Sequence, residues 1–481
     1  MGLRGLLKRE FSFISGNYRI LIISWVLMDL AMEMPVPNYQ YYIQALGGTG
    51  IALGIIGFAN FLALAIVAFP GGYLADKYGR RWLITTMTFG MSLSFLFYAF
   101  APTWHFVLLG VIVNSLCLIY QPALFAMVQD SVPKERRGMA SSLIQLIHGT
   151  FNTPGPIIAG ILLFQFGLIN SMRIIYLIVT ALFLTAAIWR LRLKETATNK
   201  EPIRFRYFFS SYPKAIKGSV DVWKSVPKSM FWLFVVQTLV MFGASLTNVI
   251  NAVYAKDVLH VPEEQWWFVY IPLLLTMIAA SIPIAKSIDR IGRKKPLILA
   301  PIIFGLGTLT FVNGNLFTIM IAMVMFGLAQ LLVRSGVMAL SADLVTPENR
   351  GKVWGFVNFI DYLSIACAML LGNFLYVSPI PQLPFYVALC LVIPEFLIIL
   401  FLVHEHEEHE GVTIPASTHE FTSKIASDDF SAEATGYILL TITSIVGALT
   451  QTLWWLLPAC TFGLLSITTM VERQHRKRTQ S

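Results

Sequence analysis

Apolar residues in this chain are gathered into blocks of roughly 20 residues, and this feature limits the possible folds more than any other. A helix of about that length crosses the ~30 Å hydrocarbon core of a bilayer. Of the 481 residues, 56% are hydrophobic and only 13% are charged, whereas about a quarter of a soluble domain is charged. A soluble core does not need so many uninterrupted apolar blocks, so we expect the chain to cross a membrane many times.

The blocks predict an all-α membrane protein with twelve transmembrane helices. The first block is too long for the apolar part of a cleavable signal peptide, so none is expected. All four cysteines lie inside apolar blocks, which argues against disulfides and a zinc site. The predicted spans are residues 19–44, 51–74, 83–101, 105–128, 139–168, 172–192, 229–256, 265–287, 296–313, 316–342, 352–377 and 382–403.

Basic residues lie in the loops on one side of these spans. They cluster at residues 77–81, 134–137, 190–228, 286–295 and 350–352, while the opposite loops hold little beyond Arg173 and Lys256. Positive charge marks cytoplasmic loops. We therefore expect a multi-pass protein of the cell membrane with a cytoplasmic N-terminus. The net charge of +9 then needs no nucleic-acid partner.

Two segments of the chain repeat each other. Residues 76–81 and 289–294 share the order Asp, basic, any residue, Gly, basic, basic, at an offset of 213 (289 − 76). Asp130 and Asp343 are separated by the same offset. Chance does not readily align two distant landmarks, so we expect a duplicated six-helix unit and two pseudo-symmetric bundles, as in transporters built from parallel repeats.

The predicted domains follow from this duplication. They are an N-terminal six-helix bundle (1–193), a basic cytoplasmic linker (194–228), a C-terminal six-helix bundle (229–403), an acidic, His-containing linker (404–436), and an extra hydrophobic segment with a basic tail (437–481). The basic linker also contains aromatic residues, so it either lies on an anionic membrane surface or is a solvated loop. The extra segment is predicted to be a re-entrant hairpin or an interfacial helix.

The segment Gly72–Arg81 resembles the signature loop between helices 2 and 3 of the major facilitator superfamily, and the resemblance extends over residues 19–403. It implies an alternating-access transporter with a charge relay at its cytoplasmic gate. Glycine permits close helix approach and tight turns. Alternatively, the basic residues only determine topology. The gate predicted from this resemblance consists of Gly72, Asp76, Gly79, Arg80, Arg81 and Asp130, with a weaker copy in Asp289, Gly292, Arg293 and Asp343.

Two acids lie inside the first predicted span, where ionisable groups are costly and usually functional. Asp29 and Glu33 have i, i+4 spacing and share one helical face. Asp29 lies ~15 Å from the cytoplasmic end. Pro35 and Pro37 follow, and they interrupt the helix. We expect these acids to share a proton or to bind a cationic substrate; the alternative is a structural pair.

Further polar residues inside the spans are candidates for the same cavity. Arg334 and Asp361 have similar depth on neighbouring helices, which predicts an ion pair, either structural or functional. Polar side chains also join helices without any other role. The neutral candidates for substrate binding or proton coupling are Gln121, His148, Asn248 and Asn251.

The predicted function is secondary active transport of a small organic molecule, coupled to a proton or another ion. The transporter is expected to be a monomer that contacts membrane lipids. Proton-coupled export of lipophilic or cationic compounds is the first hypothesis. Uptake of a sugar, organic acid or peptide by symport is the alternative, and a non-transporting membrane sensor is a third. No phosphate-binding loop or nucleophile–base set is evident, so neither an enzyme nor a cofactor is expected. The run His404–Glu410 is interpreted as a solvated acidic linker rather than a metal site.

The signatures of the family's drug exporters are incomplete. The resemblance implies an arginine in helix 4, but no basic residue lies between Gly110 and Pro122. The helix-5 pattern is present only as Gly155–Gly160. These departures leave the direction of transport open.

Overall fold

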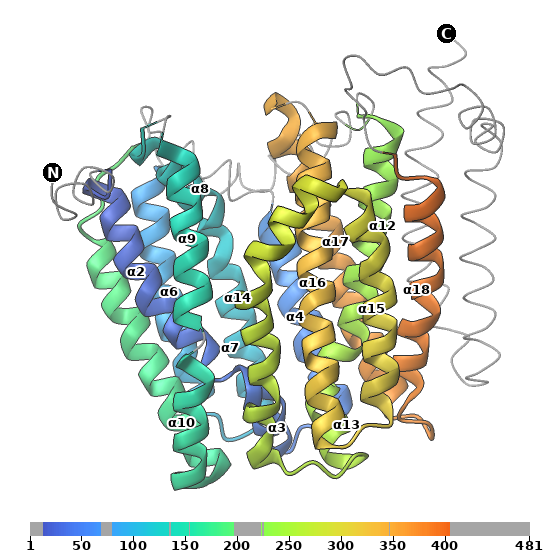
Figure 1. Ribbon diagram of the computed structural model, residues 1–481. Helices are drawn as coiled ribbons and strands as arrows, with labels where there is room; N and C mark the ends of the chain where they lie inside the picture. Colours follow the sequence, from blue (N-terminus) through green and yellow to red (C-terminus); the bar gives the residue numbers. More distant parts are fainter. Residues whose placement is uncertain are drawn as a thin grey trace, which may run out of the picture.

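The structure is a computed structural model that describes residues 13–68, 79–133, 136–152, 154–196, 223, 226–345 and 347–404. Within these ranges all regular secondary structure is helical, and long helices run side by side across the molecule (Figure 1). The predicted extra segment at 437–481 and most of both linkers lie outside the described residues.

The first half of the chain supplies six predicted spans. The first span breaks after Glu33, where Pro35 and Pro37 were expected to interrupt it. The fourth span breaks at a 3₁₀ turn, and α10 contains a non-helical residue, Gly167, that separates the fifth span from the sixth. The elements are α2 (Gly16–Glu33), η1 (Val36–Asn38), α3 (Tyr39–Ala45), α4 (Gly50–Ala68), α6 (Arg80–Ala99), α7 (Trp104–Cys117), η2 (Leu118–Tyr120), α8 (Gln121–Ser131), α9 (Arg137–Asn152) and α10 (Pro154–Arg190).

The second half follows the same plan. Its first span also breaks near the end, between Asn248 and Asn251. The elements are α12 (Lys228–Asn248), α13 (Asn251–Asp257), η4 (Glu263–Gln265), α14 (Trp266–Ile291), α15 (Lys294–Val312), α16 (Leu316–Leu344), α17 (Pro347–Tyr376) and α18 (Leu383–Phe401).

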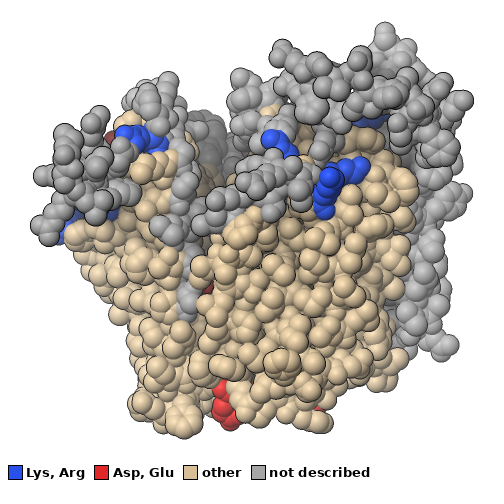
Figure 2. Space-filling view, viewed as in Figure 1, with Lys and Arg blue, Asp and Glu red and all other residues tan. Residues whose placement is uncertain are grey.

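Ten helical segments of the described chain are long and apolar enough to cross a membrane. One of them, Pro154–Arg190, comprises two spans joined at Gly167, and α14 is a further long helix, so the twelve predicted spans are accounted for. Figure 2 shows a broad band almost free of charged atoms between Lys and Arg side chains at one end and Asp and Glu at the other. This is the distribution expected of a membrane protein.

The two halves pack against each other along α4 and α17. A Cβ atom added at Gly54 would lie 2.9 Å from Asn373 Cβ, so these helices approach closely. Nearer the other end of α4, the rings of Phe61 and Tyr362 are 6.1 Å apart. Small residues allow this kind of close helix contact in a membrane.

The duplication extends to backbone conformation and to contacts. Gly79 and Gly292 occupy equivalent repeat positions, and both have positive φ, 99° and 92°. An L side chain is strained there, so glycine is required at both turns. Arg81 Nη2 donates to Leu191 O at 2.9 Å, and its counterpart Lys294 Nζ donates to Leu400 O at 2.8 Å. In each half, the last basic residue of the repeated motif therefore contacts the end of the last helix of its own half.

Candidate functional site

The acid Asp29 contacts a histidine on a neighbouring helix. Asp29 Oδ2 of α2 lies 2.7 Å from Nδ1 of His148 on α9. The ring of His148 also stands edge-on to Trp25 at 6.1 Å. The short contact lacks the alignment of a hydrogen bond, and Asp29 Oδ2 accepts no hydrogen bond from another group in the described part of the chain. Two of the predicted site residues are therefore side by side.

Glu33 lies at the end of α2, where the two halves of the chain meet. It interacts electrostatically with Asp29 on its own helix and with Tyr270 on α14. The interaction with Asp29 is consistent with the prediction that the two acids share one face of the helix. The interaction with Tyr270 brings a residue of the C-terminal half to the acids, which sequence reasoning did not anticipate.

Two glycines of α10 pack closely at this junction. A Cβ atom at Gly155 would lie 2.9 Å from Met34 N and 3.0 Å from Leu30 O, so α10 touches the backbone of α2 beside the acids. A Cβ atom at Gly160 would lie 2.5 Å from the indole ring of Trp267 on α14. The short Gly155–Gly160 motif therefore contacts both halves.

The third intramembrane acid, Asp361, is buried at the contact between α17 and α12. It accepts hydrogen bonds from Thr238 Oγ1 at 3.0 Å and from Gln237 Nε2 at 3.4 Å. Arg334 on α16 is exposed, and the predicted ion pair between Arg334 and Asp361 is wrong. Equal depth in the membrane did not imply a shared face, because Asp361 turns toward two neutral donors on α12.

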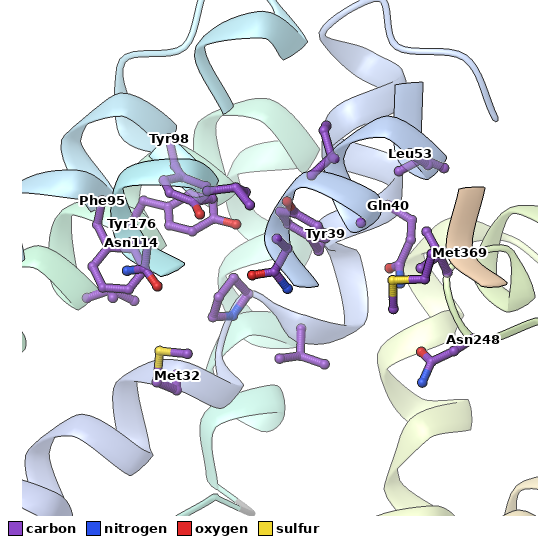
Figure 3. Close-up of a pocket in the computed structure, with 18 residues that line it drawn as sticks. Met32, Tyr39, Gln40, Leu53, Phe95, Tyr98, Asn114, Tyr176, Asn248 and Met369 are labelled. Atoms are coloured by element: carbon purple, nitrogen blue, oxygen red, sulfur yellow. The ribbon is translucent and has the colours of Figure 1, made fainter. Parts of the chain in front are cut away.

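A cavity of about 330 Å³ lies beside the breaks in the first and seventh spans. Aromatic and amide side chains line it, as Figure 3 shows. None of its 18 lining residues, all within the described part of the chain, carries a charge. Its polar lining includes residues from several different elements: Tyr39, Gln40, Tyr98, Asn114, Tyr176 and Asn248.

Hydrogen bonds orient two of the cavity amides. Asn114 Nδ2 donates to Ser94 Oγ at 3.0 Å, and Asn60 Oδ1 accepts from Ser115 Oγ at 2.5 Å. Gln40 differs, since its Oε1 is buried and has no partner among the described residues. A buried acceptor without a donor costs free energy, so Gln40 is suited to a bound molecule that donates a hydrogen bond.

α3 and α13 lie at the same end of the molecule (Figure 1), and contacts between them join the two halves there. Tyr41 of α3 donates its hydroxyl to Ala252 O of α13 at 2.8 Å. Lys256 Nζ lies 5.4 Å from the centre of the Tyr41 ring and 2.6 Å from Glu263 Oε2. These contacts join the two halves at the end opposite the basic loops.

At the other end, the predicted gate residues Arg80 and Asp130 form an ion pair. A residue that sequence reasoning missed, Glu195, joins them: its carboxylate accepts the backbone N–H groups of Arg80 and Arg81 at 3.0 and 3.2 Å. It thereby caps the N-terminus of α6, where a negative charge is stabilising. The only sequence signal for this contact was an acid at the start of a basic segment.

The family model of the Major Facilitator Superfamily matches residues 21–262 and 233–472. This chain belongs to the major facilitator superfamily. It is therefore a multi-pass membrane transporter, from a family of transporters rather than enzymes, and members of the family bind small-molecule substrates.

Individual relatives are distant. An uncharacterized MFS-type transporter, MJ1317 of Methanocaldococcus jannaschii, is 24% identical over 404 residues, which cover 81% of this chain and 95% of that protein. The multi-drug resistance efflux pump PmrA of Streptococcus pneumoniae is 24% identical over 374 residues, covering 74% and 88%. The crystal structure of a variant of the nucleoside transporter NupG superposes with a TM-score of 0.64 at 13% identity, covering 81% of this chain and 100% of NupG.

The remaining predicted site residues of this facilitator do not form one cluster. Asn248 lines the cavity, whereas Asn251 has a buried Oδ1 without a partner in the described chain. Gln121 is exposed at the start of α8. Gly72 and Asp76 lie outside the described residues, as do the side chains of Asp289 and Asp343, while Arg293 Nη1 donates to Ala339 O at 3.3 Å.

Arg190 is a second residue that the sequence did not single out. It is fully buried at the end of α10. Its Nε donates to Ser24 Oγ at 2.9 Å, its Nη1 donates to Thr88 Oγ1 at 2.8 Å, and the ring of Tyr120 lies 5.5 Å away. The N-terminal half therefore contains a buried cation supplied by its sixth span, although helix 4 lacks the arginine that the resemblance implied.

Proposed function

We propose that this facilitator exports lipophilic or cationic compounds from the cytoplasm in exchange for protons. The observation that carries the proposal is the contact between Asp29 and His148, with Glu33 one turn along the same helix. A carboxylate in the bilayer is costly without a partner. Either a proton or a substrate cation can be the partner of the carboxylate. Because the two compete for the same carboxylates, their movements are coupled.

The coupling runs through alternating access. With α3 and α13 joined, a cation from the cytoplasm reaches Asp29 and Glu33 and displaces the proton they hold. After the halves rearrange, the cation leaves on the outside and a proton takes its place. The two carboxylates repel each other, which favours holding one proton when no cation is bound. In this scheme the basic loops and the N-terminus lie in the cytoplasm.

Two further observations support export. The relative PmrA is named as a multi-drug resistance efflux pump. In addition, Gly155 and Gly160 fit tightly against α2 and α14, so the remnant of the helix-5 motif lies at the junction beside Glu33. Because of this close packing, the binding or release of a proton or cation at Asp29 and Glu33 alters the contact between the halves.

Proteoliposomes test the proposal. The double variant Asp29→Asn, Glu33→Gln should lose accumulation of a cationic dye against its gradient, because no titratable carboxylate remains on α2, while exchange of bound dye at equal concentrations is partly retained. Glu264→Gln is the matched control, since Glu264 is an exposed acid outside the candidate site. Accumulation at the wild-type level by the double variant would show that the coupling site lies elsewhere.

Proton-coupled uptake of a neutral solute is the second candidate, and the uncharged cavity favours it. The same assay separates the two functions through the sign of the pH gradient. Export from the cytoplasmic side requires protons to move against the substrate, whereas symport requires both to move together. Substrate accumulation on the side toward which protons flow would establish uptake and reject export.

A further inference from the structure

We propose that the cavity beside the helix breaks binds a neutral, planar ring system whose edge carries both hydrogen-bond donors and acceptors. This inference rests on the proposed function, because it names the part of the substrate that the cavity receives. The volume of about 330 Å³ is within the range of small-molecule pockets.

Aromatic side chains provide the flat walls that such a ring requires. The ring centres of Tyr98 and Tyr176 are 4.8 Å apart, and Phe95 stacks on Tyr176 at 6.5 Å. These residues come from α6 and α10, and Figure 3 shows them grouped on one side of the cavity, with Gln40 and Met369 on the other. Aromatic rings favour offset-stacked or edge-on contacts with other rings, so this wall selects a planar ligand.

Unpaired polar atoms define the edge of the ligand. Figure 3 shows the hydroxyl groups of Tyr98 and Tyr176 directed toward Tyr39. No hydrogen bond joins any of these three hydroxyls to another group in the described part of the chain. Gln40 Oε1 is an unpaired acceptor. A ligand therefore satisfies the site when it donates to Gln40 and accepts from the phenols.

The absence of charge from the cavity lining disfavours a charged group at this position. A cation needs a counter-charge or several acceptors when it leaves water. The nearby acids are directed elsewhere: Asp29 contacts His148, and Glu33 interacts with Tyr270. Met32 lines the cavity and immediately precedes Glu33, so an amphiphilic substrate can place its ring in the cavity and its charged end beside the acids.

Two fluorescent probes of similar shape test this assignment. Acridone is neutral and carries one N–H donor and one carbonyl acceptor, whereas 9-aminoacridine is a cation at neutral pH. Binding is measured by fluorescence anisotropy with the full-length protein in phosphatidylcholine nanodiscs, and empty nanodiscs give the background. Because no gradient is present, this measurement is independent of transport.

Gln40→Leu should weaken acridone binding about tenfold, because it removes the acceptor for the ring N–H. Gln40→Glu should strengthen 9-aminoacridine binding, because a carboxylate then lines the cavity. Tyr98→Phe, which removes only a hydroxyl, should weaken acridone binding by about threefold. Gln44→Glu is the matched control: Gln44 lies one turn further along α3, its Oε1 is also buried without a partner, and it does not line the cavity. It should change either affinity by less than about twofold.

The inference fails if acridone binds wild-type protein no better than empty nanodiscs, or if Gln40→Glu and Gln44→Glu have equal effects. If acridone binding responds as expected while the protein accumulates no substrate in proteoliposomes, the inference about the cavity stands and the proposed function fails. The reverse result, proton-driven accumulation without any effect of the cavity variants on binding, would retain the function and reject this site.

Discussion

At the scale of single residues, Arg190 shows how a charge is held inside the N-terminal half. Ser24 and Thr88 accept hydrogen bonds from its guanidinium group, and both hydroxyls donate to carbonyls of their own helices. Within the described chain, Nη2 has no partner. Neutral acceptors offset only part of the cost of burying the charge, so we infer that Arg190 stabilises the fold mainly by filling space.

This interpretation predicts different effects for two substitutions. Arg190→Ala should lower the free energy of unfolding by about 3 kcal/mol, because it leaves a cavity in the core. Arg190→Met keeps most of the volume and removes the buried charge, so it should cost less than about 1 kcal/mol. Thermal unfolding of the purified protein compares them, with the exposed Thr185→Ala as control. Equal losses for Met and Ala would show that the charge itself is required.

Single residues also show why part of the site was not predictable. Tyr39, Tyr98 and Tyr176 are far apart in the sequence and meet only through the packing of α3, α6 and α10. The depth of a residue along its helix was predictable from the span boundaries. The direction of the Asp361 side chain was not, and the ion pair predicted between Asp361 and Arg334 is therefore wrong. Short-range patterns succeeded where geometry is local, as at the helix break after Glu33.

At the scale of helices, α10 joins the two halves at the acids. The predicted spans agree with the helices because apolar length is a local property of the sequence, and the turn at Gly79 was expected from the repeat. The cap that Glu195 supplies to α6 was not expected, since it depends on a contact between residues more than 100 positions apart.

Adding a single methyl group tests the role of α10. Gly155→Ala should destabilise the protein by about 1–3 kcal/mol, because the new Cβ meets backbone atoms of α2 that cannot move independently. We also expect slower proton-coupled accumulation, since Asp29 and His148 would be displaced relative to each other. Gly355→Ala on α17 is the control, as no atom lies within 4 Å of its added Cβ. Normal stability and transport in Gly155→Ala would contradict the close contact.

At the scale of the whole molecule, alternating access requires contacts that hold one end closed and release in the other state. The hydrogen bond from Tyr41 to Ala252 O joins the halves at the end opposite the basic loops, and the Arg80–Asp130 pair lies at the basic end within the N-terminal half. By the family resemblance, the latter pair belongs to the gate that closes that end. Weakening the Tyr41 contact should therefore favour the state that is open at the α3–α13 end. Weakening the Arg80–Asp130 pair should favour the state that is open at the basic end.

Tyr41→Phe removes one hydrogen bond between the halves and keeps the ring beside Lys256. A net loss of about 1 kcal/mol changes a two-state ratio roughly fivefold, so the population open at the α3–α13 end should rise by about that factor. Spin labels at the exposed residues Thr49 and Glu264 report that opening as a longer distance. Asp130→Asn should instead lengthen the distance between labels at Lys194 and His404, exposed at the basic ends of the two halves. Unchanged distributions in both variants would show that neither contact controls access, whereas a lengthening of both distances within one variant would mean that the two ends do not alternate.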